Sequence, residues 1–408
     1  MTGDRGFVIV GASLAGAKAT QALRDEGYDG AITLIGDEAV RPYERPPLSK
    51  EFLQGKSERE KVFVHPEGWY AEHDVDLRLQ TEVTGLDRAA QEVVLAGGER
   101  LGYDAVLLTT GSVPRRLTLP GADLDGVRYL RRLEDSEAIK AAFGTASRVA
   151  IIGAGWIGLE TAAAARAAGL EVTLLEAAEL PLLRVLGTEV ATMFADLHRG
   201  HGVDLRLGVQ VAELIGKQGA VTGVRLADDS VVEADLVLVG VGILPNDGLA
   251  RDAGLDVDNG ITVDAHLRTA DPRVYAAGDV ANAYLPKLGR HIRVEHWANA
   301  RRQGATAAKS MLGQDVEFDR PPYFFSDQYD LGMEYTGYAE PGGYDRVVFR
   351  GAPDGGEYIA FWLAGDTVLA GMNVNVWDVT EALEGFVLTG RKVDVDRLTN
   401  PEVPLTEL

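Results

Sequence analysis

The sequence predicts an α/β protein with two units of parallel β-sheet flanked by helices and a smaller C-terminal α+β domain. Two stretches each run from an apolar strand through a glycine-rich turn into a helix and a second strand, which is typical of a Rossmann-like unit. From about residue 321, short alternating strands precede a single helix, which favours an antiparallel sheet. We therefore expect a discontinuous first domain at residues 1–113 and 245–320, a second at 114–244 and a third at 321–408.

The second unit carries the most specific motif. An apolar, β-branched strand at residues 148–152 runs into Gly153, Gly155 and Gly158, which have the spacing G-x-G-x-x-G. Gly153 permits a tight turn, Gly155 leaves room for a pyrophosphate, and Gly158 lets the helix pack closely on the strand. The helix that follows offers unpaired N–H groups and its positive dipole end to the phosphates. This segment predicts a dinucleotide site.

The first unit repeats this layout near the start of the chain. A strand at residues 7–10 enters a turn with Gly11 and Gly16, and a helix runs from there to about Arg24. Ser13 stands where the motif has its second glycine. Serine is small and its hydroxyl can donate to a phosphate, so we expect this turn to bind a dinucleotide as well. The chain therefore repeats one kind of unit twice.

Acidic residues end the second strand of both units. Asp37 or Glu38 in the first unit and Glu176 in the second are placed to accept hydrogen bonds from an adenosine ribose. A carboxylate at this position repels a 2′-phosphate, and the nearest downstream arginine in the second unit is Arg184. We therefore predict that the second unit binds NADH in preference to NADPH.

Other segments place small residues or charges at the ends of strands. Residues 41–50 contain three prolines and end on Lys50, which we expect near the start of a short helix. Residues 105–114 and 234–246 each combine a strand with a glycine turn, which lets the backbone approach a ligand closely. Residues 274–280 deliver Asp279, which either caps a helix or binds a hydroxyl of a cofactor.

Composition excludes several classes of function. The chain has no cysteine, which excludes a redox-active disulfide and an iron–sulfur cluster held by its own thiolates. A formal net charge of −22 argues against nucleic acid and anionic membranes as partners. No uncharged apolar run reaches the roughly 18 residues that span a bilayer, and no apolar signal segment precedes the first strand. We expect a cytoplasmic protein.

Several motifs together carry a resemblance to a known family. They are PPLSK at 46–50, TTG at 109–111, GWIGLE at 155–160, YAAGDV at 275–280, EHWANA at 295–300 and FFSDQY at 324–329. With the two nucleotide units, and over essentially the whole chain, this set resembles the FAD-dependent NADH:ferredoxin reductases. That group contains putidaredoxin reductase, rhodocoxin reductase and the ferredoxin reductase components of ring-hydroxylating dioxygenases. The resemblance implies a glutathione-reductase-like arrangement of the two dinucleotide domains.

The resemblance also implies the cofactors and the residues that bind them. The first domain would bind FAD, the second would bind NADH, and the third would cover the flavin and help to dock a ferredoxin. The residues implied for FAD are Gly11, Ser13, Leu14, Ala15, Gly16, Asp37, Glu38, Arg45, Lys50, Val83, Thr110, Gly111, Arg131, Gly278, Asp279 and Trp297. The residues implied for NADH are Gly153, Gly155, Ile157, Gly158, Glu176 and Gly242.

The expected reaction requires no nucleophilic side chain. NADH gives up two electrons as a hydride and a 2Fe-2S ferredoxin accepts one at a time, so a flavin is the natural converter. Lys50 is the candidate for stabilising the reduced flavin, and Glu160 is the candidate for pairing with Lys50 and holding the nicotinamide carboxamide. Trp297 completes the expected catalytic set by lying over the flavin. The alternative for Glu160 is an acid that the helix dipole favours near the start of the helix. The alternative for Trp297 is a buried core residue.

The expected partner is a 2Fe-2S ferredoxin, bound transiently by a monomer or homodimer. Because the chain is acidic overall, docking requires local basic patches, although scattered basic residues also occur on any solvated surface. The candidates are Arg290, Arg293, Arg301, Arg302, Lys309, Arg391 and Lys392. We expect no metal site, since His198 and His201 have no acidic or thiol partner nearby in the sequence. Two other functions stay open: an NADH oxidase, and a non-catalytic interaction protein that senses flavin and NAD.

Overall fold

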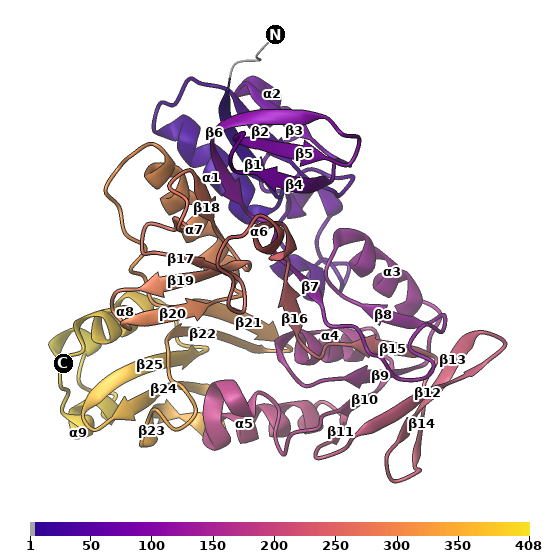
Figure 1. The fold of residues 1–408 in the computed structure, drawn as a ribbon. Coiled ribbons are helices and arrows are strands. Elements are labelled where there is room, and N and C mark those ends of the chain that lie inside the picture. Colours follow the sequence, from indigo (N-terminus) through magenta and orange to yellow (C-terminus); the bar gives the residue numbers. More distant parts are fainter. Residues whose placement is uncertain (1–4) are drawn as a thin grey trace. The chain divides into compact units, whose positions relative to one another are not determined.

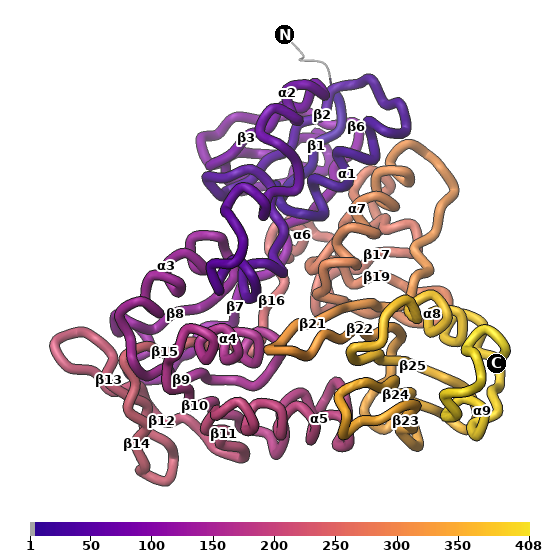
Figure 2. The backbone as a smooth tube through the Cα atoms, turned by 180° about the vertical axis from the view of Figure 1, so that it is seen from behind, coloured from indigo at the N-terminus to yellow at the C-terminus, as the bar shows by residue number. Residues whose placement is uncertain are grey.

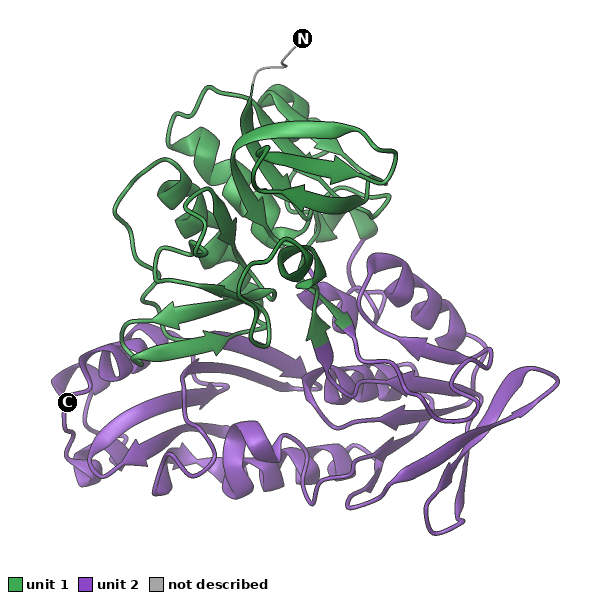
Figure 3. Ribbon diagram, viewed as in Figure 1, with its two compact units in different colours: residues 1–44, 59–113, 244–322 green, residues 45–58, 114–243, 323–408 purple. Residues whose placement is uncertain are grey.

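The computed structural model of the chain describes residues 5–408 and divides into two compact units (Figure 3). Unit 1 consists of the residues up to Glu44, Arg59–Val113 and Leu244–Pro322. Unit 2 consists of Arg45–Glu58, Pro114–Ile243 and Tyr323–Leu408. The chain therefore passes from one unit to the other after residues 44, 58, 113, 243 and 322.

Unit 1 is built on a sheet of seven strands in which β18 pairs with β6 beside the path β3-β2-β1-β6-β5-β4 (Figure 1). β1 lies between β2 and β6 in parallel register, with Val10 opposite Ile35 and Leu108. All five residues of β1 are buried, as expected for a strand at the centre of a parallel sheet. The strands are β1 (Gly6–Val10), β2 (Ile32–Ile35), β3 (Val75–Arg78), β4 (Val83–Asp87), β5 (Glu92–Leu95), β6 (Arg100–Leu108) and β18 (Val274–Ala276).

Two helices of unit 1 pack closely on each other. They are α1 (Leu14–Asp25) and α7 (Trp297–Met311). A Cβ atom at Gly304 would lie 2.3 Å from the backbone oxygen of Ala15, so a side chain at this position would separate the helices. The other elements of unit 1 are η2 (Arg59–Val62), α2 (Trp69–Glu72), α6 (Gly248–Asp252), β17 (Ile261–Val263), β19 (Ala281–Leu285) and β20 (Arg290–Arg293).

Unit 2 contains a second parallel sheet, with the strand order β11-β10-β9-β15-β8 (Figure 2). β9 lies between β10 and β15, so that Ile152 is opposite Leu175 and Val239. Its strands are β8 (Val127–Tyr129), β9 (Arg148–Ile152), β10 (Glu171–Leu175), β11 (Asp204–Arg206) and β15 (Leu236–Val239). Its helices are α3 (Leu133–Phe143), α4 (Trp156–Ala167) and α5 (Leu183–Gly200), and a separate antiparallel sheet contains β12 (Val211–Lys217), β13 (Ala220–Leu226) and β14 (Val231–Glu233).

The C-terminal part of unit 2 is an antiparallel sheet in the order β21-β22-β25-β24-β23, followed by two helices. Its strands are β21 (Tyr323–Gln328), β22 (Leu331–Gly337), β23 (Arg346–Ala352), β24 (Glu357–Ala364) and β25 (Thr367–Val374), and its helices are α8 (Thr380–Thr389) and α9 (Val395–Thr399). The main apolar core of unit 2 joins this sheet to the helices of the parallel part. Within it, the buried Trp362 donates its indole N–H to the backbone oxygen of Leu186, at 3.1 Å.

The expected α/β architecture with a C-terminal α+β part is present. The last long helix begins at Thr380, after residues 375–379 form an irregular connection from β25. Five short elements complete the described residues: η1 (Pro46–Ser49), β7 (Ser112–Pro114), β16 (Ile243–Pro245), η3 (Pro353–Gly355) and η4 (Leu405–Glu407). The strands β7 and β16 lie where the chain changes units. Among residues 5–408, no helix has both the length and the apolar character needed to cross a membrane.

Candidate active site

The glycine turn of unit 2 is shaped to receive a phosphate group. Gly153 has a φ of +101°, and a Cβ atom at Gly158 would lie 1.9 Å from the Gly153 oxygen, so both positions require glycine. Gly155, the N-cap of α4, is different: a Cβ atom there would meet no atom within 4 Å. The first turn of α4 also contains no acidic residue. Open space in front of the helix N-terminus therefore fits the pyrophosphate of a dinucleotide.

The acidic residue at the end of β10 is held beside this turn. Glu176 accepts hydrogen bonds from the backbone N–H groups of Ala154, at 2.6 Å, and Ala178, at 2.8 Å. The side chain is half-buried, and both contacts fix the direction in which its carboxylate points. A fixed carboxylate at this strand end is the arrangement that binds an adenosine ribose in Rossmann-like units.

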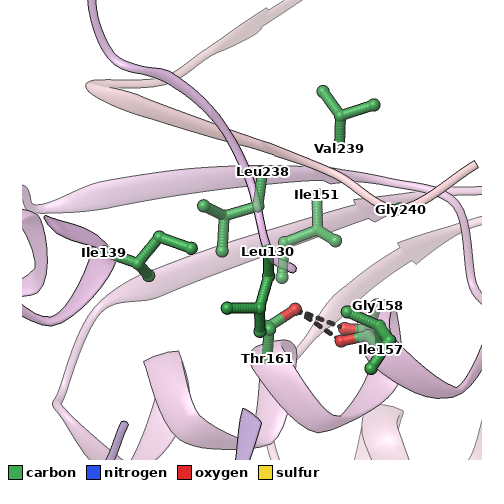
Figure 4. A pocket seen from close by; sticks show the side chains of 9 residues that line it. All are labelled: Leu130, Ile139, Ile151, Ile157, Gly158, Thr161, Leu238, Val239 and Gly240. Atoms are coloured by element: carbon green, nitrogen blue, oxygen red, sulfur yellow. Dashed lines mark hydrogen bonds between the residues drawn. The ribbon is translucent and has the colours of Figure 1, made fainter. Parts of the chain in front are cut away.

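An apolar pocket lies at the carboxyl ends of β9 and β15, which is where parallel sheets bind ligands (Figure 4). Its lining residues are Leu130, Ile139, Ile151, Ile157, Gly158, Thr161, Leu238, Val239 and Gly240. The Thr161 hydroxyl donates to the backbone oxygen of Ile157, at 2.8 Å, and so turns inward to its own helix (Figure 4). Gly242, which follows the pocket strand, has a φ of +99° and open space beside it. Together these features fit the residues predicted for NADH.

Glu160, in the second turn of α4, forms a buried ion pair with Lys50. The Lys50 Nζ atom is 3.1 Å from the Glu160 Oε1 atom, and the two side chains are only 8% and 5% exposed. The ammonium group also lies 4.9 Å from the centre of the Phe325 ring. The expected pairing of Lys50 with Glu160 is therefore present. Lys50 does not start a helix, as the sequence suggested, but follows η1 as its C-cap.

Two serines complete the surroundings of Glu160. Ser49 Oγ donates to Glu160 Oε2 at 2.5 Å, and Ser326 Oγ donates to Oε1 at 2.7 Å. Removing ions from water is costly, so a buried pair requires partners for all of its charge. The carboxylate has three hydrogen-bond donors, the adjacent Ser49 and Lys50 and the distant Ser326, from two separate segments of the chain. The cluster therefore holds one cation and one anion, at fixed positions, next to the helix that begins at the glycine turn.

The glycine turn of unit 1 has the same close approaches. Gly11 has a φ of +124°, and a Cβ atom there would lie 2.1 Å from the Thr109 oxygen. A Cβ atom at Gly16 would lie 2.3 Å from the Gly11 oxygen. Ser13 is the N-cap of α1, yet its side chain makes no capping hydrogen bond, and the first turn has no acidic residue. The Ser13 hydroxyl and the N–H groups of this turn therefore fit a phosphate, as expected for FAD.

The two acids at the end of β2 differ in their surroundings. Glu38 is half-buried and accepts a hydrogen bond from the Tyr43 hydroxyl at 2.5 Å, whereas Asp37 is exposed. Both lie at the carboxyl end of a parallel strand, and so fit the expected ribose position. Leu14 and Ala15 are buried in the first turn of α1, and Val83 begins β4 in the same unit.

The second turn of unit 1 is closed by hydrogen bonds. Thr110 and Asn246 exchange two of them, through the Thr110 hydroxyl at 2.7 Å and the Asn246 amide at 2.8 Å. Gly111, next to Thr110, has a φ of +66°. The turn therefore holds the backbone of Thr110 and Gly111 in a fixed position at the carboxyl end of β6.

Asp279 does not cap a helix, which corrects one of the two expectations for it. The strand β19 follows it and pairs with β17 and β20, and the next helix begins only at Trp297. Asp279 instead accepts a hydrogen bond from the Ser112 hydroxyl, at 2.9 Å. Gly278 has a φ of +81° and donates its N–H to Gln303 at 2.8 Å. The interpretation that Asp279 binds a cofactor hydroxyl stays a prediction.

Trp297 is half-buried at the first position of α7. Its indole N–H donates to Glu44 at 2.8 Å, and the Arg301 guanidinium lies 4.3 Å from the ring centre. Arg45 and Arg131, also predicted for FAD, belong to unit 2, where Arg45 donates to the Arg131 backbone oxygen at 2.7 Å. The structure thus gives the side chains of Trp297 and Arg45 defined local partners.

The sequence did not identify the partners of the histidines on α5. His198 is fully buried, with its Nε2 atom 2.8 Å from the Gln328 amide oxygen and its Nδ1 atom 3.1 Å from the Tyr329 hydroxyl. Burial lowers the pKa of His198 to about 4, so its ring is neutral at pH 7. Residues 5–408 contain no cluster of three or more metal-ligating side chains. Ser49 and Ser326, the donors to Glu160, were likewise missed.

Two glycine turns of the dinucleotide-binding type, in a chain without cysteine, are typical of a pyridine nucleotide oxidoreductase. The chain belongs to the pyridine nucleotide-disulphide oxidoreductase family, which matches residues 6–304, and a reductase C-terminal domain matches residues 323–408. Members of this family use FAD and NAD(H). The resemblance seen in the motifs is therefore confirmed.

Named relatives cover the chain almost completely. Putidaredoxin reductase of Pseudomonas putida is 38% identical over 413 residues, which is 100% of this chain and 97% of the relative. The ferredoxin–NAD(+) reductase component of the anthranilate 1,2-dioxygenase system of Burkholderia cepacia is 39% identical and matches 98% of each chain. The crystal structure of the covalent putidaredoxin reductase–putidaredoxin complex superposes with a TM-score of 0.95 at 37% identity, and covers 100% of this chain and 98% of that one.

Proposed function

We propose that this chain takes a hydride from NADH onto FAD and passes the electrons one at a time to a 2Fe-2S ferredoxin. The ferredoxin would supply a cytochrome-type monooxygenase or a ring-hydroxylating dioxygenase. A bound flavin supplies the conversion of a two-electron donor into single electrons. The observation that carries the proposal is the buried Lys50–Glu160 pair, in a chain without cysteine. Its Glu160 lies on α4, the helix that begins at the open glycine turn.

The experiment that tests this function is NADH-dependent reduction of cytochrome c, with and without a panel of purified 2Fe-2S ferredoxins. We expect a rate that depends on at least one ferredoxin and saturates with it. NADH consumption matched by hydrogen peroxide, with no ferredoxin effect, would instead indicate an NADH oxidase. Very slow NADH oxidation under all conditions would indicate a non-catalytic protein that senses the nucleotide.

The proposed FAD site in unit 1 follows the predicted residues. Gly11 and Gly16 allow the close turn, Ser13 and the N-terminus of α1 bind the pyrophosphate, and the acids at the end of β2 bind the ribose. The remaining contacts of unit 1 are assigned to Leu14, Ala15, Val83, Thr110, Gly111, Gly278, Asp279 and Trp297. The contributions of Arg45, Lys50 and Arg131 to FAD binding are predictions from the family resemblance.

The proposed NADH site lies in unit 2. Gly155 and the N-terminus of α4 bind the pyrophosphate, while Glu176 binds the adenosine ribose and repels a 2′-phosphate. Ile157, exposed at the first turn of α4, and Gly242 line the path from the turn to the apolar pocket. These assignments support a preference for NADH over NADPH.

Lys50 and Glu160 have complementary roles in this proposal. A nicotinamide carboxamide offers both an N–H donor and an oxygen acceptor, and the pair presents a carboxylate and an ammonium group at fixed positions. The carboxylate binds the amide N–H, which orients the ring. The ammonium group supplies a positive charge that favours the negative charge developing during hydride transfer. Burial strengthens both effects because water does not screen them.

Docking of the ferredoxin depends on the basic residues that remain exposed. Arg293 is engaged by Glu295 and the Asp279 oxygen, and Lys309 pairs with Glu26 at 3.1 Å. Arg301, Arg391 and Lys392 are exposed, and Arg302, next to Arg301 on α7, is half-buried. We therefore assign docking chiefly to Arg301 and Arg302 of α7, with Arg391 and Lys392 as a second patch.

Three further assignments belong to the proposal. The functional domains are residues 1–113 with 245–320 for FAD, 114–244 for NADH and 321–408 for the interface. The protein acts in the cytoplasm, where a reduced nicotinamide pool is available. It acts as a monomer or homodimer, and gel filtration of the flavin-loaded protein distinguishes the two states.

A further inference from the structure

A chain of buried polar side chains runs from Glu160 to the surface of unit 2. Ser326 Oγ is 2.7 Å from Glu160 Oε1, and Gln328 Nε2 is 3.1 Å from Ser326 Oγ. Gln328 Oε1 is 2.8 Å from His198 Nε2, and His198 Nδ1 is 3.1 Å from the Tyr329 hydroxyl. Ser326, Gln328 and His198 are each at most 1% exposed. Such a continuous polar chain in an apolar core requires a reason beyond packing.

The hydrogen bonds of this chain point in one direction. An ionised Glu160 can only accept, so Ser326 donates to it and must itself accept from the Gln328 amide N–H. The Gln328 oxygen then faces His198, whose Nε2 atom must carry the hydrogen. His198 Nδ1 is left to accept from the Tyr329 hydroxyl. Each member thus donates toward Glu160.

The backbone conformation of Tyr329 places its hydroxyl at the end of the polar chain that is farthest from Glu160. Tyr329 lies in the turn between β21 and β22 with a φ of +58°, which is uncommon for a bulky residue. In this conformation its ring stacks on His201, with 3.7 Å between the ring centres, while its hydroxyl reaches His198. A tyrosine keeps the left-handed backbone conformation only where its contacts outweigh the strain.

We propose that Ser326, Gln328 and His198 are positioning residues for the reaction of this protein: they hold the Glu160 carboxylate in one orientation toward the nicotinamide carboxamide. This inference rests on the role of Glu160 given in the proposed function. Glu160 has three rotatable side-chain bonds, and Ser49 and Lys50, which are adjacent in the chain, each contact one of its two oxygens. Ser326 shares the Oε1 atom with Lys50. Through Gln328 and His198 it ties this oxygen to β21 and α5, and so holds the carboxylate from a second direction.

The test compares two substitutions that interrupt the polar chain of hydrogen bonds with one that preserves it. Ser326→Ala removes the donor to Glu160, and His198→Leu removes the group that orients Gln328. His198→Gln keeps a side-chain amide that can donate to Gln328. Tyr335→Phe is the matched control, because it removes another buried hydroxyl of unit 2, one that accepts a hydrogen bond from Ala339. All four variants are loaded with FAD, and NAD+ affinity is measured by calorimetry alongside KM and kcat for NADH with ferricyanide.

We expect Ser326→Ala to weaken NAD+ binding about 10-fold, as for loss of a hydrogen bond to a charged group. His198→Leu should weaken it several-fold, and the KM for NADH should rise with it. His198→Gln should restore most of the affinity. Tyr335→Phe should lower the melting temperature but leave NAD+ affinity unchanged.

Glu160→Gln separates failure of this inference from failure of the proposed function. If Glu160→Gln leaves NAD+ affinity unchanged, the proposed role of Glu160 itself is wrong. If Glu160→Gln weakens binding while Ser326→Ala and His198→Leu bind like the unmodified protein, only the positioning inference is overturned. Equal loss in His198→Leu and His198→Gln would also overturn it. Should His198→Leu fail to fold, Tyr329→Phe, which keeps the stacked ring, replaces it, with a smaller loss of affinity expected and an unchanged affinity counting against the inference.

Discussion

Glu176 and Ala154 are joined by a hydrogen bond in which the Ala154 backbone N–H donates to the Glu176 carboxylate at 2.6 Å. Ala154 lies inside the glycine turn, between Gly153 and Gly155. The acid proposed for the ribose and the turn proposed for the pyrophosphate are therefore linked directly. Changing the acid should alter which nucleotide is selected and also remove one contact that holds the turn.

Glu176→Ala should reduce the preference for NADH. Removing the carboxylate removes both a ribose contact and the repulsion of a 2′-phosphate, so the ratio of kcat/KM for NADH to that for NADPH should fall about 10-fold or more. Steady-state assays with both nucleotides measure this ratio. Glu171→Ala, at the exposed start of β10, is the control. Equal catalytic efficiency of the unmodified protein with NADH and NADPH would refute the assignment.

Gly155→Ala should separate nucleotide binding from folding. A Cβ atom at Gly155 meets open space in the protein, so the melting temperature should change little, while the methyl group obstructs the approach of the pyrophosphate. Calorimetry should show NAD+ affinity weakened about 10-fold or more. Gly158→Ala is the contrasting variant, since its Cβ atom would lie 1.9 Å from a backbone oxygen and should destabilise the fold. If Gly155→Ala binds NAD+ with unchanged affinity, the pyrophosphate does not bind at this turn.

Lys50→Met should slow flavin reduction by NADH, measured in a stopped-flow instrument. The substitution removes the positive charge and leaves Glu160 buried without its cation, which costs about 3 kcal/mol in comparable pairs. We expect a rate at least 10-fold lower and a lower melting temperature. Lys56→Met, an exposed change in the same segment, controls for loss of charge. An unchanged reduction rate would remove Lys50 from the mechanism.

Reversing the charges of Arg301 and Arg302 to Glu should raise the apparent KM for ferredoxin and leave ferricyanide reduction unchanged. Charged residues at the edge of an interface act mainly on association, so the effect should diminish as salt is added. Reversing the exposed Lys61 and Lys217 to Glu changes the net charge by the same amount outside α7. If the two double variants raise the KM equally, the effect is one of net charge and α7 is not the docking surface.

Stability should decrease as the pH falls from 6.5 toward 4. Burial lowers the pKa of His198 to about 4, against about 6.5 in an unfolded chain, so the unfolded state takes up a proton first in this window. His198→Gln should make the melting temperature less dependent on pH between 6.5 and 4, as measured by calorimetry. The exposed His291→Gln should keep the original dependence. Parallel curves for all three proteins would contradict the assignment.

Local spacing explains what the sequence could predict. The glycine turns, the acids after β2 and β10 and the α/β architecture all follow from residues close together in the chain, where strand, turn and helix signals reinforce one another. The Lys50–Glu160 pair was expected only because two separate motifs resemble one family.

Long-range contacts explain what it could not predict. Ser49 and Ser326 reach Glu160 across 111 and 166 residues, and His198 reaches Gln328 across 130. No periodicity links such positions. The helix expected after Asp279 is a strand, because pairing with β17 and β20 outweighs local preference.

The five passages of the chain between the two units have a consequence for biosynthesis. The strand β18 and the helix α7 complete unit 1, yet they are translated after most of unit 2. A nascent chain therefore cannot finish its first nucleotide fold until α7 has emerged from the ribosome, unlike proteins whose domains follow one another from the N-terminus. We expect nascent chains stalled before residue 297 to remain sensitive to protease in unit 1, and acquisition of FAD to be a late event at the ribosome.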